Sequence, residues 1–150
     1  MATRSITEIG TVVVYRHWDG YIAEQGADLL DFIELERSGE LKSGGRISDK
    51  DYLAARFVAY LADKYRVEGS GPTDFLSVGV YAKGAYSDYG EEYRYRVTDD
   101  GSVRYQARSW GHRPGEVVWS DWQPLTREVV DREIAARDSR IAAAVAAGDV

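Results

Sequence analysis

The residues with the richest chemistry follow a short apolar stretch near the start of the chain. Val12 to Val14 is β-branched, which favours extended structure. Behind it stand a cation, an imidazole, a large aromatic ring, a carboxylate and a phenol: Arg16, His17, Trp18, Asp19 and Tyr21. Such groups at a strand end are sufficient to bind a polar ligand. They are also typical of the start of a helix. In that interpretation Asp19 caps the helix or forms a turn, Trp18 packs in the core, and Gly20 adopts a positive φ.

A second group of candidate residues lies on a predicted β-hairpin. Apolar and polar residues alternate on both sides of Asp99-Asp100-Gly101. Keeping the apolar residues on one face pairs Val97 with Val103 and leaves a three-residue loop, in which Gly101 suits the left-handed conformation. The other face then carries four arginines, Arg94, Arg96, Arg104 and Arg108.

In this register Arg96 stands opposite Arg104, and like charges directly across a sheet destabilise it. One interpretation is local: water and nearby carboxylates, such as Glu92 facing Arg108 or the acidic face of the first helix, neutralise the arginines. The other is an anionic partner, because arginine binds phosphate and carboxylate with a planar fork. That partner is a phosphate-bearing small molecule, whose base Tyr and Trp of neighbouring loops could stack, or the acidic surface of another protein.

An enzyme is a further alternative. His17 with Asp19 or His112 could serve as acid and base in a small hydrolase or nuclease, since imidazole titrates near neutrality. Two histidines and no cysteine leave little for a zinc site. The sequence has no phosphate-binding glycine loop and no Gly-x-Ser-x-Gly elbow. It therefore indicates no catalytic residue, no metal ligand and no cofactor.

The run from Tyr15 to Tyr21 (Tyr-Arg-His-Trp-Asp-Gly-Tyr), followed by Gly26 and Leu29-Leu30, resembles a tyrosine, histidine, aspartate-glycine-tyrosine signature. That signature occurs in small uncharacterised proteins of bacteriophages and prophages, in which a proline is common where this chain has Ile22. The resemblance implies a phage or mobile-element setting and a small host-modulating or anti-defence protein. It implies no activity for any residue.

Bulk composition narrows the classes of partner. A chain of 150 residues is the size of one domain, so a single domain over residues 1–150 is expected. The net charge of −6, with both signs mixed along the chain, argues against long nucleic acid and anionic membrane. The sequence shows neither the apolar core of a signal peptide nor an apolar stretch long enough to span a membrane. We expect a cytoplasmic protein, in the host cell if it is phage-encoded, and the oligomeric state, including a homo-oligomer, stays open.

The elements that position these residues follow from periodicity. Helical spacing begins at Ile22 and ends at Ser38-Gly39, with Glu24, Asp28 and Asp31 on an acidic outer face. A second helix begins at Ser48, capped by that residue with Asp51 three positions on. A turn-rich segment over 68–73 precedes the strands.

Strands dominate the second half of the chain. The period becomes two from Leu76 to Ala82, and the hairpin follows. A further strand runs over 116–122 and places Trp119 and Trp122 on opposite faces. Thr126 caps a final helix. The predicted class is α+β, with an antiparallel sheet of about five strands in the order β-α-α-β-β-β-β-α and helices on one face.

The preferred interpretation is a non-enzymatic binding protein that occupies a host component through its arginine and aromatic residues. A host protein is the first candidate partner and would need a broad face with exposed Tyr and Trp anchors. A phosphorylated small molecule, such as a nucleotide signal, is the alternative. It would require the same groups to converge on a concave pocket.

Overall fold

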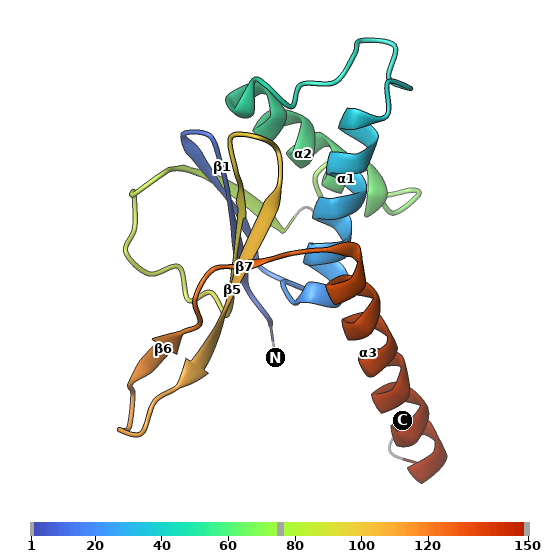
Figure 1. Cartoon of the computed structure of the whole chain (residues 1–150). Coiled ribbons are helices and arrows are strands. Elements are labelled where there is room, and N and C mark those ends of the chain that lie inside the picture. Colours follow the sequence, from blue (N-terminus) through green and yellow to red (C-terminus); the bar gives the residue numbers. More distant parts are fainter. Residues whose placement is uncertain (1, 75–76, 149–150) are drawn as a thin grey trace.

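The computed structural model describes residues 2–74 and 77–148, and the helices lie on one side of a mixed β-sheet (Figure 1). The strand order is β3-β2-β1-β4-β5-β6, and β7 also pairs with β5. The strands are β1 (Ser5–Ile9), β2 (Val12–Arg16), β3 (Val78–Ala82), β4 (Tyr93–Val97), β5 (Val103–Trp110), β6 (Val117–Trp119) and β7 (Gln123–Pro124). The helices are the π-helix η1 (Ile22–Gly26) and the α-helices α1 (Ala27–Arg37), α2 (Lys50–Lys64) and α3 (Arg127–Ala147).

The α+β class is confirmed, but the strand count and order need correction. The described residues form a seven-stranded sheet instead of one of about five, because β1 is additional and β6 and β7 are separate. The strand expected from Leu76 begins at Val78, and Leu76 itself lies outside the described residues. Across residues 2–74 and 77–148, no helix has the length and apolar character needed to cross a bilayer.

The additional strand β1 makes the sheet mixed. It forms a hairpin with β2 through Gly10 and Thr11, and it pairs in parallel with β4. An early strand of the chain therefore lies at the centre of the sheet. Ser5 and Thr7 of β1 are polar yet fully buried, so the strand lacks the alternation of apolar and polar residues that identifies a half-buried strand.

The predicted hairpin is confirmed in its register and in its turn. Val97 pairs with Val103 and Arg96 with Arg104. Gly101 has a φ of 81°, which is the left-handed conformation expected of it. Because the alternate residues of these strands enter the core, the arginines lie on the face of the sheet that the helices leave open.

The strand expected over 116–122 is interrupted, and its two tryptophans share one face. The ring of Trp119 lies over Arg94, with 3.8 Å between the ring centroid and Cζ, and Trp122 lies over Arg96 at 4.1 Å. Arg94 and Arg96 alternate on the same side of β4, so both rings cover the same row of arginines. The chain between β6 and β7 leaves the strand conformation, which removes the two-residue period on which the expectation depended.

Helix caps agree with the sequence in one case and differ in another. Thr126 caps α3 as predicted, through its side-chain oxygen. The cap of α2 is Asp49 and not Ser48. Asp51 accepts hydrogen bonds from both the main-chain N and the Oγ1 of Thr11, and therefore ties α2 to the turn between β1 and β2.

Gly20 is required by close packing and not by its φ. The positive φ of this segment falls on Asp19, at 57°. A Cβ atom on Gly20 would lie 2.7 Å from main-chain atoms of Arg4 and Ser5. We expect Gly20→Ala to lower the free energy of unfolding in urea by about 1–3 kcal/mol, the usual cost of overpacking a closed site. A variant as stable as the wild type would contradict this close approach.

Candidate functional site

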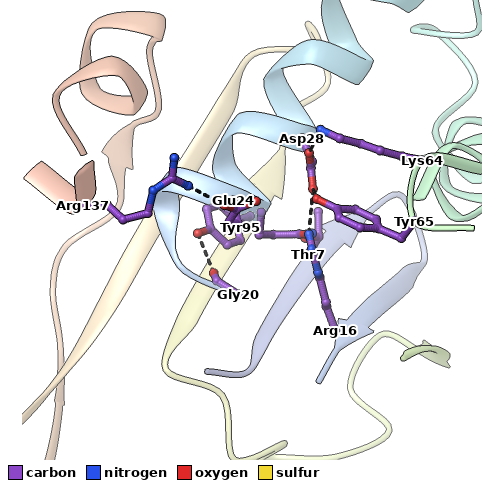
Figure 2. A network of polar contacts seen from close by, with 10 residues as sticks. Thr7, Arg16, Gly20, Glu24, Asp28, Lys64, Tyr65, Tyr95 and Arg137 are labelled. Atoms are coloured by element: carbon purple, nitrogen blue, oxygen red, sulfur yellow. Dashed lines mark hydrogen bonds and ion pairs between the residues drawn. The ribbon is translucent and has the colours of Figure 1, made fainter. Parts of the chain in front are cut away.

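The first predicted cluster is divided by the structure, and its arginine points inward from β2 (Figure 2). Arg16 Nη1 donates hydrogen bonds to Gln25 Oε1 at 2.6 Å and to Asp28 Oδ2 at 2.8 Å. The Arg16 and Asp28 side chains are 5% and 1% exposed. They form a buried ion pair between the sheet and α1. Asp28, which was expected on the acidic outer face of its helix, is therefore inside the protein.

Asp28 connects several elements through this network (Figure 2). It accepts a hydrogen bond from the Tyr65 hydroxyl at 2.5 Å and pairs with Lys64 of α2. Burial lowers the pKa of Arg16, but its interactions with Tyr65 and Asp28 outweigh burial and the net pKa is raised. Arg16 is thus held as a cation that links β2 to α1 and to the segment after α2.

The network makes the stability of the protein sensitive to alkaline pH through Tyr65. Burial, followed by the hydrogen bond to Asp28, raises the pKa of Tyr65 from its ordinary 10 to about 12. The unfolded chain loses this proton first as the pH rises above 10, so the free energy of unfolding falls between pH 10 and 12. Ultraviolet titration should show that Tyr65→Phe removes a tyrosine ionising near pH 12. Loss of one ionising near pH 10 would contradict this assignment.

The middle of the cluster stays near the surface. The imidazole Nδ1 of His17 lies 2.9 Å from the Tyr15 hydroxyl. The Trp18 ring, 52% exposed, packs edge-on against His17. Asp19 is the non-glycine residue with positive φ among the described residues, a strained conformation that is found at functional sites. A hollow of about 300 Å³ lies beside Trp18 and Asp19.

The geometry expected of a histidine-based enzyme is not formed by the residues that the structure describes. Within that part of the chain, no hydrogen bond joins His17 to Asp19 or to His112, and the His17 Nδ1 atom contacts Tyr15. The same residues include no group of three His, Asp or Glu side chains suited to a metal ion. The hydrolase or nuclease alternative therefore gains no support from this arrangement.

Carboxylates of the same chain neutralise two of the four hairpin arginines. Arg94 Nε donates to Glu91 Oε1 at 2.9 Å, and Arg96 Nε donates to Glu8 Oε2 at 2.6 Å. The two tryptophan rings described above cover the same guanidinium groups. Arg94 and Arg96 therefore need no external anion, which removes the electrostatic argument for a partner there. Arg104, opposite Arg96, is exposed.

Arg108, unlike Arg94 and Arg96, is not neutralised by a carboxylate of the described residues. The main-chain N of Arg108 donates to the carbonyl of Glu92 at 2.9 Å, but among the described residues the two side chains form no ion pair. Arg108 Nη1 donates to the Glu91 carbonyl at 3.1 Å, and Trp110 lies beside the guanidinium. Arg108 Nε is buried without a hydrogen-bond partner in the described part of the chain. The charge of Arg108 thus has no counter-ion among the residues that the structure describes.

One residue of each predicted group, Tyr21 and Arg108, lines a hollow of about 650 Å³. It lies between the end of β5 and α3, beside the segment that precedes β1 (Figure 1). Its aromatic lining is Tyr21, Tyr93 and Trp110. Its charged lining is Arg4, Arg108, Arg137, Arg140, Asp88 and Glu92.

Main-chain hydrogen bonds position Arg4 at this hollow. Gly20 N donates to the carbonyl of Thr3 at 2.8 Å, and Glu92 N donates to the carbonyl of Arg4 at 2.9 Å. The segment before β1 is thereby held between the loop before η1 and the start of β4. Arg4 Nη1 lies 3.4 Å from the place where a Cβ on Gly90 would stand, so the glycine makes room for the guanidinium.

Helix α3 supplies the remaining arginines. Arg137 pairs with Glu24 of η1 (Figure 2). It also pairs, at 3.1 Å, with its neighbour Asp138. The contact with Glu24 fixes α3 against the start of the first helix. Arg140, nearly one turn further along α3, lines the same hollow. A contact between two helices therefore places both arginines opposite the end of the sheet.

The hollow is positive although the whole protein is negative. Four arginines and two carboxylates line it, whereas the net charge of the chain is −6. Of the four arginines, Arg137 is already paired with Glu24 and Asp138. Among the described residues, neither Arg4 nor Arg140 forms an ion pair with a carboxylate. Burial, followed by nearby carboxylates, raises the pKa of both Tyr21 and Tyr93. Both phenols stay protonated near neutral pH and can donate hydrogen bonds to an anion.

Three arginines of the hollow, Arg4, Arg137 and Arg140, are absent from the residues that the sequence predicts. Arg137 and Arg140 lie in a helix whose alternating charges are typical of a solvated surface, and Arg4 precedes an unexpected strand. Trp110 beside Arg108 is the local signal that could have directed attention to this end of β5. Searches of protein-family models, of curated proteins and of solved structures found no match to this chain.

Proposed function

We propose that this protein binds a phosphorylated small molecule with a planar ring, such as a nucleotide signal, in the hollow between β5 and α3. The observation that carries the proposal is the convergence there of four arginines and three aromatic rings from separate parts of the chain. Arginine pairs with phosphate through two parallel hydrogen bonds. The volume of about 650 Å³ falls within the range of roughly 300–1,000 Å³ of small-molecule sites.

The lining divides into two functional parts. Trp110 is 73% exposed and offers a large ring face for stacking. Arg4 and Arg140 carry charges without a carboxylate partner among the described residues and bind the phosphate groups. Tyr21 and Tyr93, as neutral phenols, add hydrogen-bond donors. The ligand thus contributes both a ring and an anionic end.

The run over residues 15–21 resembles a signature of phage and prophage proteins, and this resemblance supports a biological setting in which the binding would act. A phage or mobile-element protein that sequesters a nucleotide signal would withhold it from a host component. Such a protein acts by occupancy, so it requires binding groups and no catalytic residue. The proposed mechanism is therefore capture of the ligand and competition with its host receptor.

Calorimetry and thermal-shift measurements with nucleoside mono-, di- and triphosphates test the proposal. Trp110→Ala should weaken binding by about 5- to 150-fold, since stacking of one base on an aromatic ring contributes roughly 1–3 kcal/mol. Because Trp110 is 73% exposed, its loss should leave the melting temperature unchanged. Val118→Ala, on the same hairpin but outside the hollow, is the matched control. If no nucleotide binds the wild type, the proposal is wrong.

A host protein with an acidic surface is the second candidate partner. The β5–β6 hairpin projects from the body of the protein (Figure 1). It exposes 37% of Val117 and 44% of Val118 beside Trp110. Exposed Arg113 lies in the turn of this hairpin, next to the apolar tip. Val118→Asp should abolish capture of such a protein and leave nucleotide binding unchanged, which separates the two candidates.

A further inference from the structure

One carboxylate that lines the hollow, beside its arginines, has no hydrogen-bond or ion-pair partner in the described part of the chain. Glu92 directly precedes β4 and lines the hollow. Among the described residues, its side chain forms neither an ion pair nor a hydrogen bond. Asp88, the other carboxylate there, is already engaged, because its Oδ1 accepts a hydrogen bond from Gly90 N at 2.7 Å. Glu92 is therefore the carboxylate available to a ligand.

The chemistry of Glu92 restricts which part of the ligand it can contact. An ionised carboxylate only accepts hydrogen bonds, through two oxygens, and it repels phosphate. Its best planar partner is a pair of neighbouring N–H donors, as in its two-pronged contact with arginine. Among the common bases, guanine presents such a pair, N1–H and the N2 amino group. Adenine and cytosine place their amino group beside an acceptor nitrogen, and uracil has a single N–H between two carbonyls.

The position of Glu92 places this carboxylate beside the stacking ring. Glu92 lies directly across from Arg108 on the neighbouring strand, and its main-chain carbonyl accepts a hydrogen bond from Arg108 N. Trp110 follows two residues later on β5 and therefore projects on the same side as Arg108. A base stacked on Trp110 presents its edge toward Glu92. Arg4 and Arg140 remain for the phosphate groups.

Resting on the nucleotide binding proposed above, we infer that the hollow selects guanine nucleotides and that Glu92 determines this specificity. Glu92 accepts hydrogen bonds from guanine N1–H and N2–H while the ring stacks on Trp110. A base without this pair of donors leaves the carboxylate desolvated and unpaired, which costs affinity.

Calorimetry with GTP, ITP and ATP tests the inference. GTP should bind at least about fivefold more tightly than ATP or ITP, which lacks the N2 amino group, because a two-pronged base contact contributes roughly 1–3 kcal/mol of discrimination. Glu92→Gln should lower the affinity for GTP and raise the affinity for ATP, because it removes a carboxylate that ATP leaves unpaired and that repels phosphate, so the preference for GTP is lost. Glu128→Gln, which removes the same charge from the exposed side of α3, should change neither affinity.

The outcomes separate the inference from the function on which it rests. Equal affinities for the three nucleotides in the wild type would overturn guanine selection and leave nucleotide binding in place. Absence of binding for all three would overturn both. A guanine preference that persists in Glu92→Gln would overturn the role of Glu92.

Discussion

Asp28→Ala is expected to lower the free energy of unfolding by about 3–5 kcal/mol, the cost of removing one partner of a buried ion pair. The variant leaves the Arg16 guanidinium, in a side chain that is 5% exposed, without a carboxylate. It also removes the acceptor of the Tyr65 hydroxyl and the partner of Lys64. Urea unfolding followed by tryptophan fluorescence measures the change.

Asp31→Ala is the matched control on the same helix. Asp31 is 43% exposed and pairs at 2.7 Å with Arg127, which is 38% exposed. An exposed pair of this kind contributes less than about 1 kcal/mol. Replacing both buried partners, as Arg16→Met with Asp28→Leu, should recover much of the stability lost in Asp28→Ala. Equal losses for Asp28→Ala and Asp31→Ala would show that the network is not a stabilising centre.

Replacement of Arg4 and Arg140 together by glutamine is expected to weaken nucleotide binding by about a hundredfold or more. Each charge-assisted hydrogen bond to phosphate contributes roughly 1.5–3 kcal/mol, which is at least about tenfold in affinity. The salt dependence of binding should also fall, because two of the cations that salt screens are absent. Among the described residues neither arginine forms an ion pair, so the melting temperature should stay close to that of the wild type.

The matched control for that double variant is Arg113→Gln with Arg132→Gln. Both residues are exposed, and Arg132 lies on α3 without lining the hollow. The control changes the net charge equally, so it separates a local contact from general electrostatic attraction. Equal loss of affinity in the two double variants would remove Arg4 and Arg140 from the site.

Local sequence rules were sufficient for the parts of the fold that depend on local geometry. The hairpin register followed from the alternation around Asp99-Asp100-Gly101, because pleat and turn both constrain it. The cap at Thr126 followed from the preference of helix starts for a side-chain oxygen. These features require only a few neighbouring residues, so a single sequence specifies them.

The features that the sequence does not reveal depend on distant contacts. β1 could not be recognised from apolar alternation, because its buried positions include polar residues. Thr7, for example, is buried because its hydroxyl accepts a hydrogen bond from Gln25 of η1. Asp28 occupies a position that helical periodicity assigns to the exposed face. Its burial depends on Arg16, which lies twelve positions earlier in the chain. The hollow joins Arg4, Arg108 and Arg140, which no spacing along the chain connects. Tertiary packing decides all three cases.

The central place of β1 has a consequence for synthesis of the protein. Ser5 pairs with Tyr93 in parallel, so one edge of this strand has no partner until most of the chain has left the ribosome. Joining such distant segments is slow, because a long loop must close before the new contacts form. During that interval the free edge can recruit strands of other nascent chains. The yield of folded protein should therefore depend on elongation rate and on chaperone supply more than the modest size of the chain suggests.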